Sequence, residues 1–182
     1  MYEDIFLDVT TALETLGHRH GDEYFQGKWE EKHWMNTPGP IYCGDTDNCG
    51  TGPDAAPYNV ALDEHSYQII YRQPINLNEL SQVWDAAWAD PFSGYGADGN
   101  LHWTRETIKT WWTEQKPKVE QEVRRLINIR LVLNTNNTQA YYRELRWWQG
   151  YLQTGLYKYL QVYAFFLDNG RIPTESERLP EL

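Results

Sequence analysis

A helical repeat of large apolar side chains in the last third of the chain constrains the fold more than any other feature. Between residues 138 and 169 these side chains recur at helical intervals, as Tyr142, Leu145, Trp148, Leu152, Leu156, Leu160, Tyr163 and Phe166. This spacing is typical of an amphipathic helix with one face in a core. Asn169-Gly170 is a helix stop signal. We therefore predict one long helix over 138–169, whose aromatic stripe belongs to the core.

Further helical patterns precede this one. Thr104 is a typical N-cap residue for a helix reaching Glu114, and Pro117 should interrupt that pattern and open a fresh helix to Leu133. The polar turn Asn134–Asn137 is short, so the last two helices should lie antiparallel.

The front of the chain is different, because proline and glycine interrupt it. Residues 36–57 hold four Pro and four Gly in 22 residues, which predicts a long loop that is functional or held by its own contacts. Residues 58–62 and 67–72 read as a β-hairpin joined by Asp63–Ser66. Shorter helices are expected over 3–16, over 21–34 with a break at Gly27, and from Asn76 or Asn78 to Ala89. The last has one apolar face made of Leu80, Val83, Trp84, Ala87 and Trp88.

These elements predict a mainly α (α+β) fold in a single domain over 1–182. It combines a C-terminal antiparallel helix pair, a small β-hairpin and a long ordered acidic loop. We expect an acidic portion rich in loop and hairpin over 1–100, a helical portion over 101–170 and a tail over 171–182. Nine Trp and thirteen Tyr argue against disorder.

Charge changes sign along the chain. Residues 1–100 carry 17 acidic and 4 basic side chains, whereas residues 101–182 carry 9 and 12, which gives formal charges of −13 and +3. The negative field of residues 1–100 attracts cationic partners and repels nucleic acid and anionic lipid. We therefore expect a partner with a basic surface, no nucleic acid and no membrane.

The candidate partner-binding residues lie in and beside the proline- and glycine-rich loop. Carboxylates there could mimic the phosphates that a basic cleft binds, and an aromatic side chain could anchor the contact. The predicted set is Asp45, Asp47, Asp54, Asp63, Glu64, Tyr42 and Trp34. Trp29, Tyr58 and Tyr95 are also expected to be exposed.

A metal site is the alternative, because His18, His20, Cys43 and Cys49 are all zinc-ligand types. Their spacing, H-x-H followed by C-x5-C, matches no common zinc ribbon or finger. Two other motif matches do not predict a site. Gly94–Gly99 fits the dinucleotide-binding pattern G-x-G-x-x-G, but no strand is expected before it. The loop that begins at Asp45 resembles a calcium-binding EF-hand loop but lacks its last carboxylate ligand. We expect no catalytic activity and no cofactor, and a plain adaptor subunit remains a third hypothesis.

Segments between Gly17 and Trp112 resemble proteins of bacterial effector–immunity cassettes, namely GHRHGDEYFQGKWEEKHW, NTPGPIYC, DNCGTGP and DPFSGYGADGN. The resemblance is to cognate immunity proteins of polymorphic toxins delivered by contact-dependent or type VI systems, and it covers about half of the chain. It implies a soluble, often acidic protein that occludes the active site of one toxin without doing chemistry itself. It carries over no residue assignments, because the class spans many folds. The acidic N-terminus lacks the basic start of a signal peptide, so we expect a cytoplasmic location.

Overall fold

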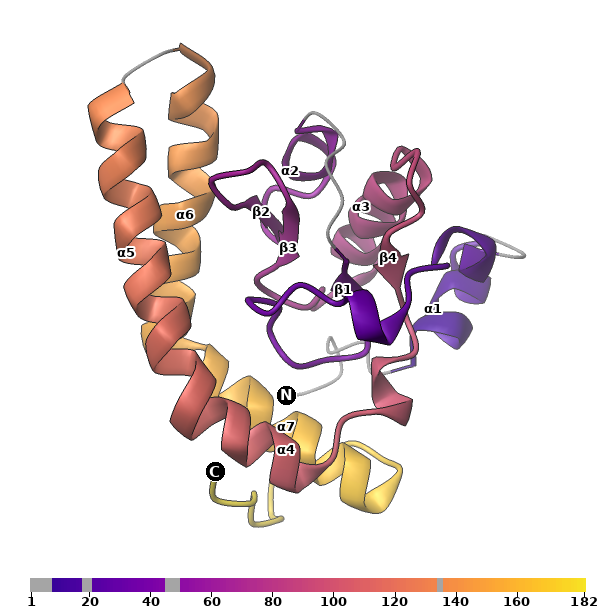
Figure 1. Ribbon diagram of the computed structural model, residues 1–182. Coiled ribbons are helices and arrows are strands. Elements are labelled where there is room, and N and C mark those ends of the chain that lie inside the picture. The colour runs from indigo at the N-terminus through magenta and orange to yellow at the C-terminus, as the bar shows by residue number, and fades with distance from the viewer. Residues whose placement is uncertain (1–7, 18–20, 45–49, 134–135) are drawn as a thin grey trace.

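Helices and two small antiparallel strand pairs make up the computed structural model, which describes residues 8–17, 21–44, 50–133 and 136–182. Strand β1 (Tyr42–Cys43) pairs with β4 (Tyr95–Gly96), and β2 (Val60–Leu62) pairs with β3 (Gln68–Ile70). The prediction of a mainly α (α+β) fold is confirmed (Figure 1). The helices are α1 (Val9–Thr15), α2 (Thr51–Ala55), α3 (Leu77–Trp88), α4 (Arg105–Thr110), α5 (Lys116–Leu133), α6 (Asn136–Thr154) and α7 (Leu156–Asn169).

The predicted C-terminal helix pair is confirmed as α5 and α6. Figure 1 shows the two helices side by side as a hairpin, and α4 and α7 pack together at its base. Helix α7 ends at Gly170, whose φ of +67° closes the helix in the left-handed conformation that glycine adopts readily. None of the helices in the described ranges combines the length and the apolarity that crossing a membrane requires.

Two details of these helices differ from the prediction. The predicted helix from Pro117 to Leu133 is present as α5, which begins at Lys116, but no break precedes it, because a π-helical turn, Trp111–Gln115, joins α4 to α5. Proline has no N–H to donate to the preceding helical turn. The π turn just before Pro117 shifts the register of the backbone hydrogen bonds there. The predicted helix over 138–169 is instead two helices that meet at Gly155. A Cβ atom there would lie 2.8 Å from a ring carbon of Tyr151, so a larger residue at this junction would force that ring to shift.

The β2–β3 hairpin separates two hydrophobic cores. Alternate side chains of a strand point to opposite faces, so Ala61 and Ile69 face one core while Val60 and Ile70 face the other. The first core is built mainly from α4 to α7 and includes Trp148. The second core joins the hairpin to α1 and α3. The hairpin thereby links the acidic front portion to the C-terminal helices.

The proline- and glycine-rich segment is held by buried side-chain amides. Asn36 donates to the carbonyls of His33 (2.8 Å) and Cys43 (2.7 Å), and its oxygen accepts from Ile70 N at 2.8 Å. Gln73 donates to the carbonyl of Ile41 at 2.7 Å. Over the described residues 36–44 and 50–57, the prediction of a loop is correct except for two short elements, β1 and α2. The expectation that the loop is fixed by its own contacts holds for the described part.

The first helices are shorter than predicted. Helix α1 begins at Val9, with Asp8 as its N-cap, and the predicted start at residues 3–7 lies outside the described residues. The predicted helix over 21–34 is wrong. That segment contains two 3-10 turns, η1 (Gly21–Tyr24) and η2 (Trp29–Glu31), one on each side of Gly27, and single β-bridges at Gln26 and Lys32.

Candidate functional site

A row of aromatic side chains runs along helix α3 and beyond its end. Trp84 and Trp88 are four residues apart, which places them on the same side of the helix. The ring of Tyr24, from η1, meets Trp84 edge-to-face with 5.5 Å between the ring centroids. Trp88 is 60% exposed and Phe92, just beyond the helix, is 68% exposed. Large aromatic side chains with this exposure are typical anchors of protein interfaces.

The turn after α3 holds Phe92 in its exposed position. The buried carboxylate of Asp90 accepts hydrogen bonds from Phe92 N (3.0 Å) and Gly94 N (2.9 Å), and the Asp90 carbonyl accepts from Ser93 N. Because this turn is fixed before any partner arrives, ordering Phe92 on binding costs less conformational entropy.

The segments around the aromatic row carry carboxylates and no cations. Residues 8–17 contain two Asp or Glu, residues 73–101 contain four, and neither range contains Lys or Arg. Helices α1 and α3 contact each other, and both contact η1. Their exposed acidic residues are Asp8, Glu14, Glu23 and Asp85. We call these four carboxylates, together with Tyr24, Trp84, Trp88 and Phe92, the acidic aromatic face.

This face was missed in the sequence because Trp88 was assigned to the buried side of α3. The structure instead buries the small side chains Ala86 and Ala87 with Leu80 and Val83, so the helix lies close to the second core on that side. Trp88 consequently lies outside the core. The absence of Lys and Arg from residues 73–101 was the sequence signal that could have located the face.

The prediction that Tyr42 is an exposed anchor is wrong. Tyr42 is 1% exposed, and its hydroxyl lies 2.7 Å from Asp98 Oδ1 and 2.9 Å from the carbonyl of Gly27. Burial, and then the Asp98 carboxylate, raise the pKa of Tyr42. Tyr95 is buried as well, because β1 and β4 pair at this point. Trp29 is half-buried and stacks on His102 with 4.5 Å between the ring centroids.

Asp63 is also unsuited to contact a partner, because it is buried in the hairpin turn. Its carboxylate accepts from the backbone N–H of His65 (2.8 Å) and Tyr67 (2.9 Å), and one oxygen lies 3.5 Å from Nε2 of the buried His33. Nδ1 of His33 accepts from Met35 N, which leaves Nε2 as the donor toward Asp63. Burial alone would raise the pKa of Asp63, but the hydrogen bonds from His33 and the two amides outweigh it and lower the pKa.

Replacing Asp63 by asparagine should therefore destabilise the fold in a pH-dependent manner. A carboxylate whose pKa is lowered by folding contributes stability above its unfolded pKa of about 3.9 and loses it as the pH falls. At neutral pH we expect Asp63→Asn to lower the free energy of unfolding by about 1.5–3 kcal/mol, the range for hydrogen bonds to charged groups. Urea unfolding of both chains should show this difference shrinking below about pH 4. A difference that stays constant with pH would contradict this assignment of Asp63.

The remaining predicted residues do not converge on one site. Trp34 is exposed, as predicted, and Asp54 is exposed on α2, but no described contact joins the two. Glu64 is exposed, yet its carboxylate pairs with Arg125 at 2.8 Å, so its charge is already compensated by α5. Asp45 and Asp47 lie outside the described residues, and their role stays a prediction.

Three of the four predicted metal ligands lie outside the residues that the structure describes. His18, His20 and Cys49 belong to the segments that the structure leaves undescribed. Cys43 is buried, and desolvation raises the pKa of its thiol well above the usual value. Among the described residues no three His, Cys, Asp or Glu side chains are grouped to hold a metal ion.

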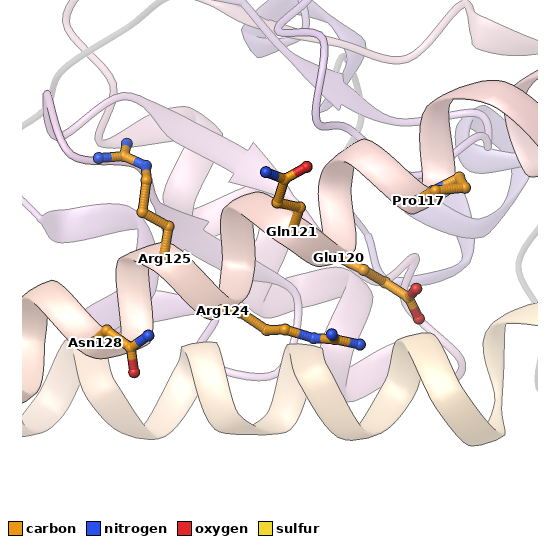
Figure 2. A pocket seen from close by; sticks show the side chains of 6 residues that line it. All are labelled: Pro117, Glu120, Gln121, Arg124, Arg125 and Asn128. Carbon is orange, nitrogen blue, oxygen red and sulfur yellow. The ribbon is translucent and has the colours of Figure 1, made fainter.

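A hollow of about 350 Å³ on the outside of α5 is lined by Pro117, Glu120, Gln121, Arg124, Arg125 and Asn128. Figure 2 shows Gln121 and Arg125 on one side of the helix and Glu120 and Arg124 on another. All six residues belong to one helix, so the hollow is an open surface with charges of both signs. Arg125 also binds Glu122 and Glu64. These side chains do not converge on a common point, and we do not assign a site to this hollow.

Comparisons with protein-family models, curated proteins and solved structures found no match for the chain. The functional interpretation therefore depends on the geometry and charge of the acidic aromatic face.

Proposed function

We propose that this chain is an immunity protein, which binds a cognate bacterial toxin or effector through the acidic aromatic face and occludes its active site. It acts by binding, without chemistry of its own, in the cytoplasm. The observation that carries the proposal is the exposure of Trp88 and Phe92 within residues 73–101, a segment without Lys or Arg. The resemblance of residues 17–112 to immunity proteins supports it independently.

Charge and aromatic anchors would have separate tasks in such a complex. Carboxylates on a surface without cations raise the rate at which a basic protein arrives, and like charge repels nucleic acid and anionic lipid. Buried aromatic anchors mainly slow dissociation. The basic cleft of a toxin that acts on nucleic acid or nucleotides has the complementary charge.

The test begins with two immobilised baits incubated with lysate of the native host. One bait is the chain itself, and the other carries Trp88→Ala and Phe92→Ala. A basic protein retained by the first bait and lost from the second is then purified and produced in cells with and without the chain. We expect a complex of submicromolar affinity and restored growth when the chain is present.

Two results would overturn the proposal. One is a purified partner that binds the chain but whose toxicity is unchanged, since the chain would then be an adaptor. The other is equal retention on both baits, because binding would then not use the acidic aromatic face. A matched bait carrying Leu131→Ala should behave as the unchanged chain, because Leu131 is an exposed apolar residue on α5, outside the face.

A further inference from the structure

The chain forms the same aspartate-centred turn twice, once inside the β2–β3 hairpin (residues 63–67) and once between α3 and β4 (residues 90–94). In each turn the aspartate carboxylate accepts from the backbone N–H groups two and four residues further on, at distances from 2.8 to 3.0 Å. The fourth residue is a serine with a positive φ, +68° at Ser66 and +51° at Ser93, and its N–H donates to the aspartate carbonyl. These recurring hydrogen bonds fix the backbone at the tip of each turn.

The two turns differ in the residue at the tip. The third residue of the first turn is His65, a polar side chain that water solvates readily where it is exposed. The third residue of the second turn is Phe92, which is 68% exposed. A phenylalanine ring at this exposure contributes little to the core and leaves apolar surface in water. The second turn therefore presents an apolar ring on a fixed backbone, whereas the first turn closes a hairpin.

Both ends of the second turn are also fixed. Asp90 N donates to a carbonyl in the last turn of α3 at 3.2 Å, and the carbonyl of Gly94 accepts from Gly44 N at 2.8 Å. Figure 1 shows this connection where the chain turns back from α3 toward β4. Pro91 adds a fixed φ next to Phe92. A partner can therefore enclose the ring without first having to order the turn, which reduces the entropic cost of binding.

The two turns also differ in how the charge of the aspartate is compensated. Asp63 lies 3.5 Å from the imidazole of His33, whereas Asp90 forms no ion pair with a cation among the described residues. Asp85, exposed on α3, adds a second negative charge, and residues 73–101 contain no Lys or Arg. The segment that carries the Phe92 ring is therefore negative throughout and favours a positively charged neighbour.

We propose that this turn inserts the Phe92 ring into an apolar pocket of the partner, with Lys or Arg side chains of the partner around the rim of that pocket. The inference rests on the proposed function and deepens it, because it states what surface the partner must offer. Interface anchors commonly fill a well-packed, desolvated pocket, and a cationic rim complements Asp85 and Asp90. Asp90 and Ser93 act as positioning residues, because they hold the backbone that carries the ring.

Substitutions of the ring itself distinguish a pocket from a flat contact. The probe is the basic protein that the unchanged chain retains and the Trp88→Ala, Phe92→Ala bait loses, and calorimetry measures its affinity for each variant. In a pocket that fits phenylalanine, the smaller Phe92→Ala and the larger Phe92→Trp should each weaken binding by at least about tenfold. On a flat surface Phe92→Trp would keep or increase the affinity, and this result would overturn the inference.

The positioning role is tested by loosening the turn. Asp90→Ala removes both acceptors and should weaken binding by at least about tenfold, whereas Asp90→Asn keeps one acceptor oxygen and should recover part of the affinity. Ser93→Gly gives the turn more conformations without harming the fold, and should weaken binding about threefold. Ser66→Gly is the matched control, because it loosens the first turn in the same way and should leave the affinity unchanged. Unchanged affinity in Ser93→Gly and both Asp90 variants would overturn the positioning role.

The outcomes separate this inference from the proposed function. If the chain neutralises the captured protein and Phe92→Ala binds it as tightly as the unchanged chain, the proposed function stands on Trp88 and the pocket for Phe92 is overturned. If the captured protein binds through Phe92 but its toxicity is unchanged, the proposed function is overturned and the pocket stands. If the unchanged chain retains no basic protein, both are overturned.

Discussion

A chain in which Trp88 and Phe92 are both replaced by alanine should bind its partner at least about 100-fold more weakly than the unchanged chain. Central aromatic anchors commonly cost about 2 kcal/mol or more each when truncated, and each 1.4 kcal/mol is about tenfold in affinity. Both side chains are more than half exposed, so their removal takes little from either core. Calorimetry with the captured partner measures the change in affinity, and surface plasmon resonance should place most of it in the dissociation rate.

The control for this prediction is the stability of the same variant. Its urea midpoint should stay close to that of the unchanged chain, because exposed substitutions away from special contacts rarely change stability by more than about 0.5 kcal/mol. The Leu131→Ala chain should retain full affinity. If the double variant bound the partner with an affinity within threefold of that of the unchanged chain, the partner would have to bind elsewhere.

Replacing Trp148 by alanine should give the largest loss of stability among the substitutions considered, about 3–5 kcal/mol. Trp148 is fully buried in the first core and stacks on Tyr71 with 5.7 Å between the ring centroids. Truncation therefore leaves a large cavity where α6 meets the hairpin. Urea unfolding monitored by circular dichroism measures the difference.

Phenylalanine at the same position separates packing from hydrogen bonding. Nε1 of Trp148 has no hydrogen-bond acceptor among the described residues, so losing it removes an unsatisfied donor. We expect Trp148→Phe to cost much less than Trp148→Ala. Equal losses for the two variants would mean that the indole N–H, and not the ring, stabilises this position.

The sequence was a reliable guide where structure depends on near neighbours. The repeat of apolar residues located the C-terminal helices, and the alternation around Asp63–Ser66 located the hairpin, since both patterns arise from contacts within a few residues. The bend at Gly155 was missed because an apolar stripe continues across it. The closeness of the Tyr151 ring to Gly155 can be seen only in the structure.

The candidate site depended on contacts between distant residues, and the prediction was therefore less successful. Tyr42 is buried because β1 pairs with β4, more than fifty residues further along the chain. Asp63 is buried because His33 lies against it. Trp88 is exposed because α3 presents its alanines to the second core. None of these three outcomes follows from composition or local periodicity.

The most direct test of the central claim is the rate of association with the captured partner as a function of salt. If carboxylates of the acidic aromatic face attract a basic protein, the rate constant should fall at least about tenfold from about 20 mM to about 500 mM salt. The charge reversal Asp85→Lys should lower the rate at low salt and reduce this dependence. A rate constant that is independent of salt, or unchanged by Asp85→Lys, would contradict the claim that this face binds a positively charged protein.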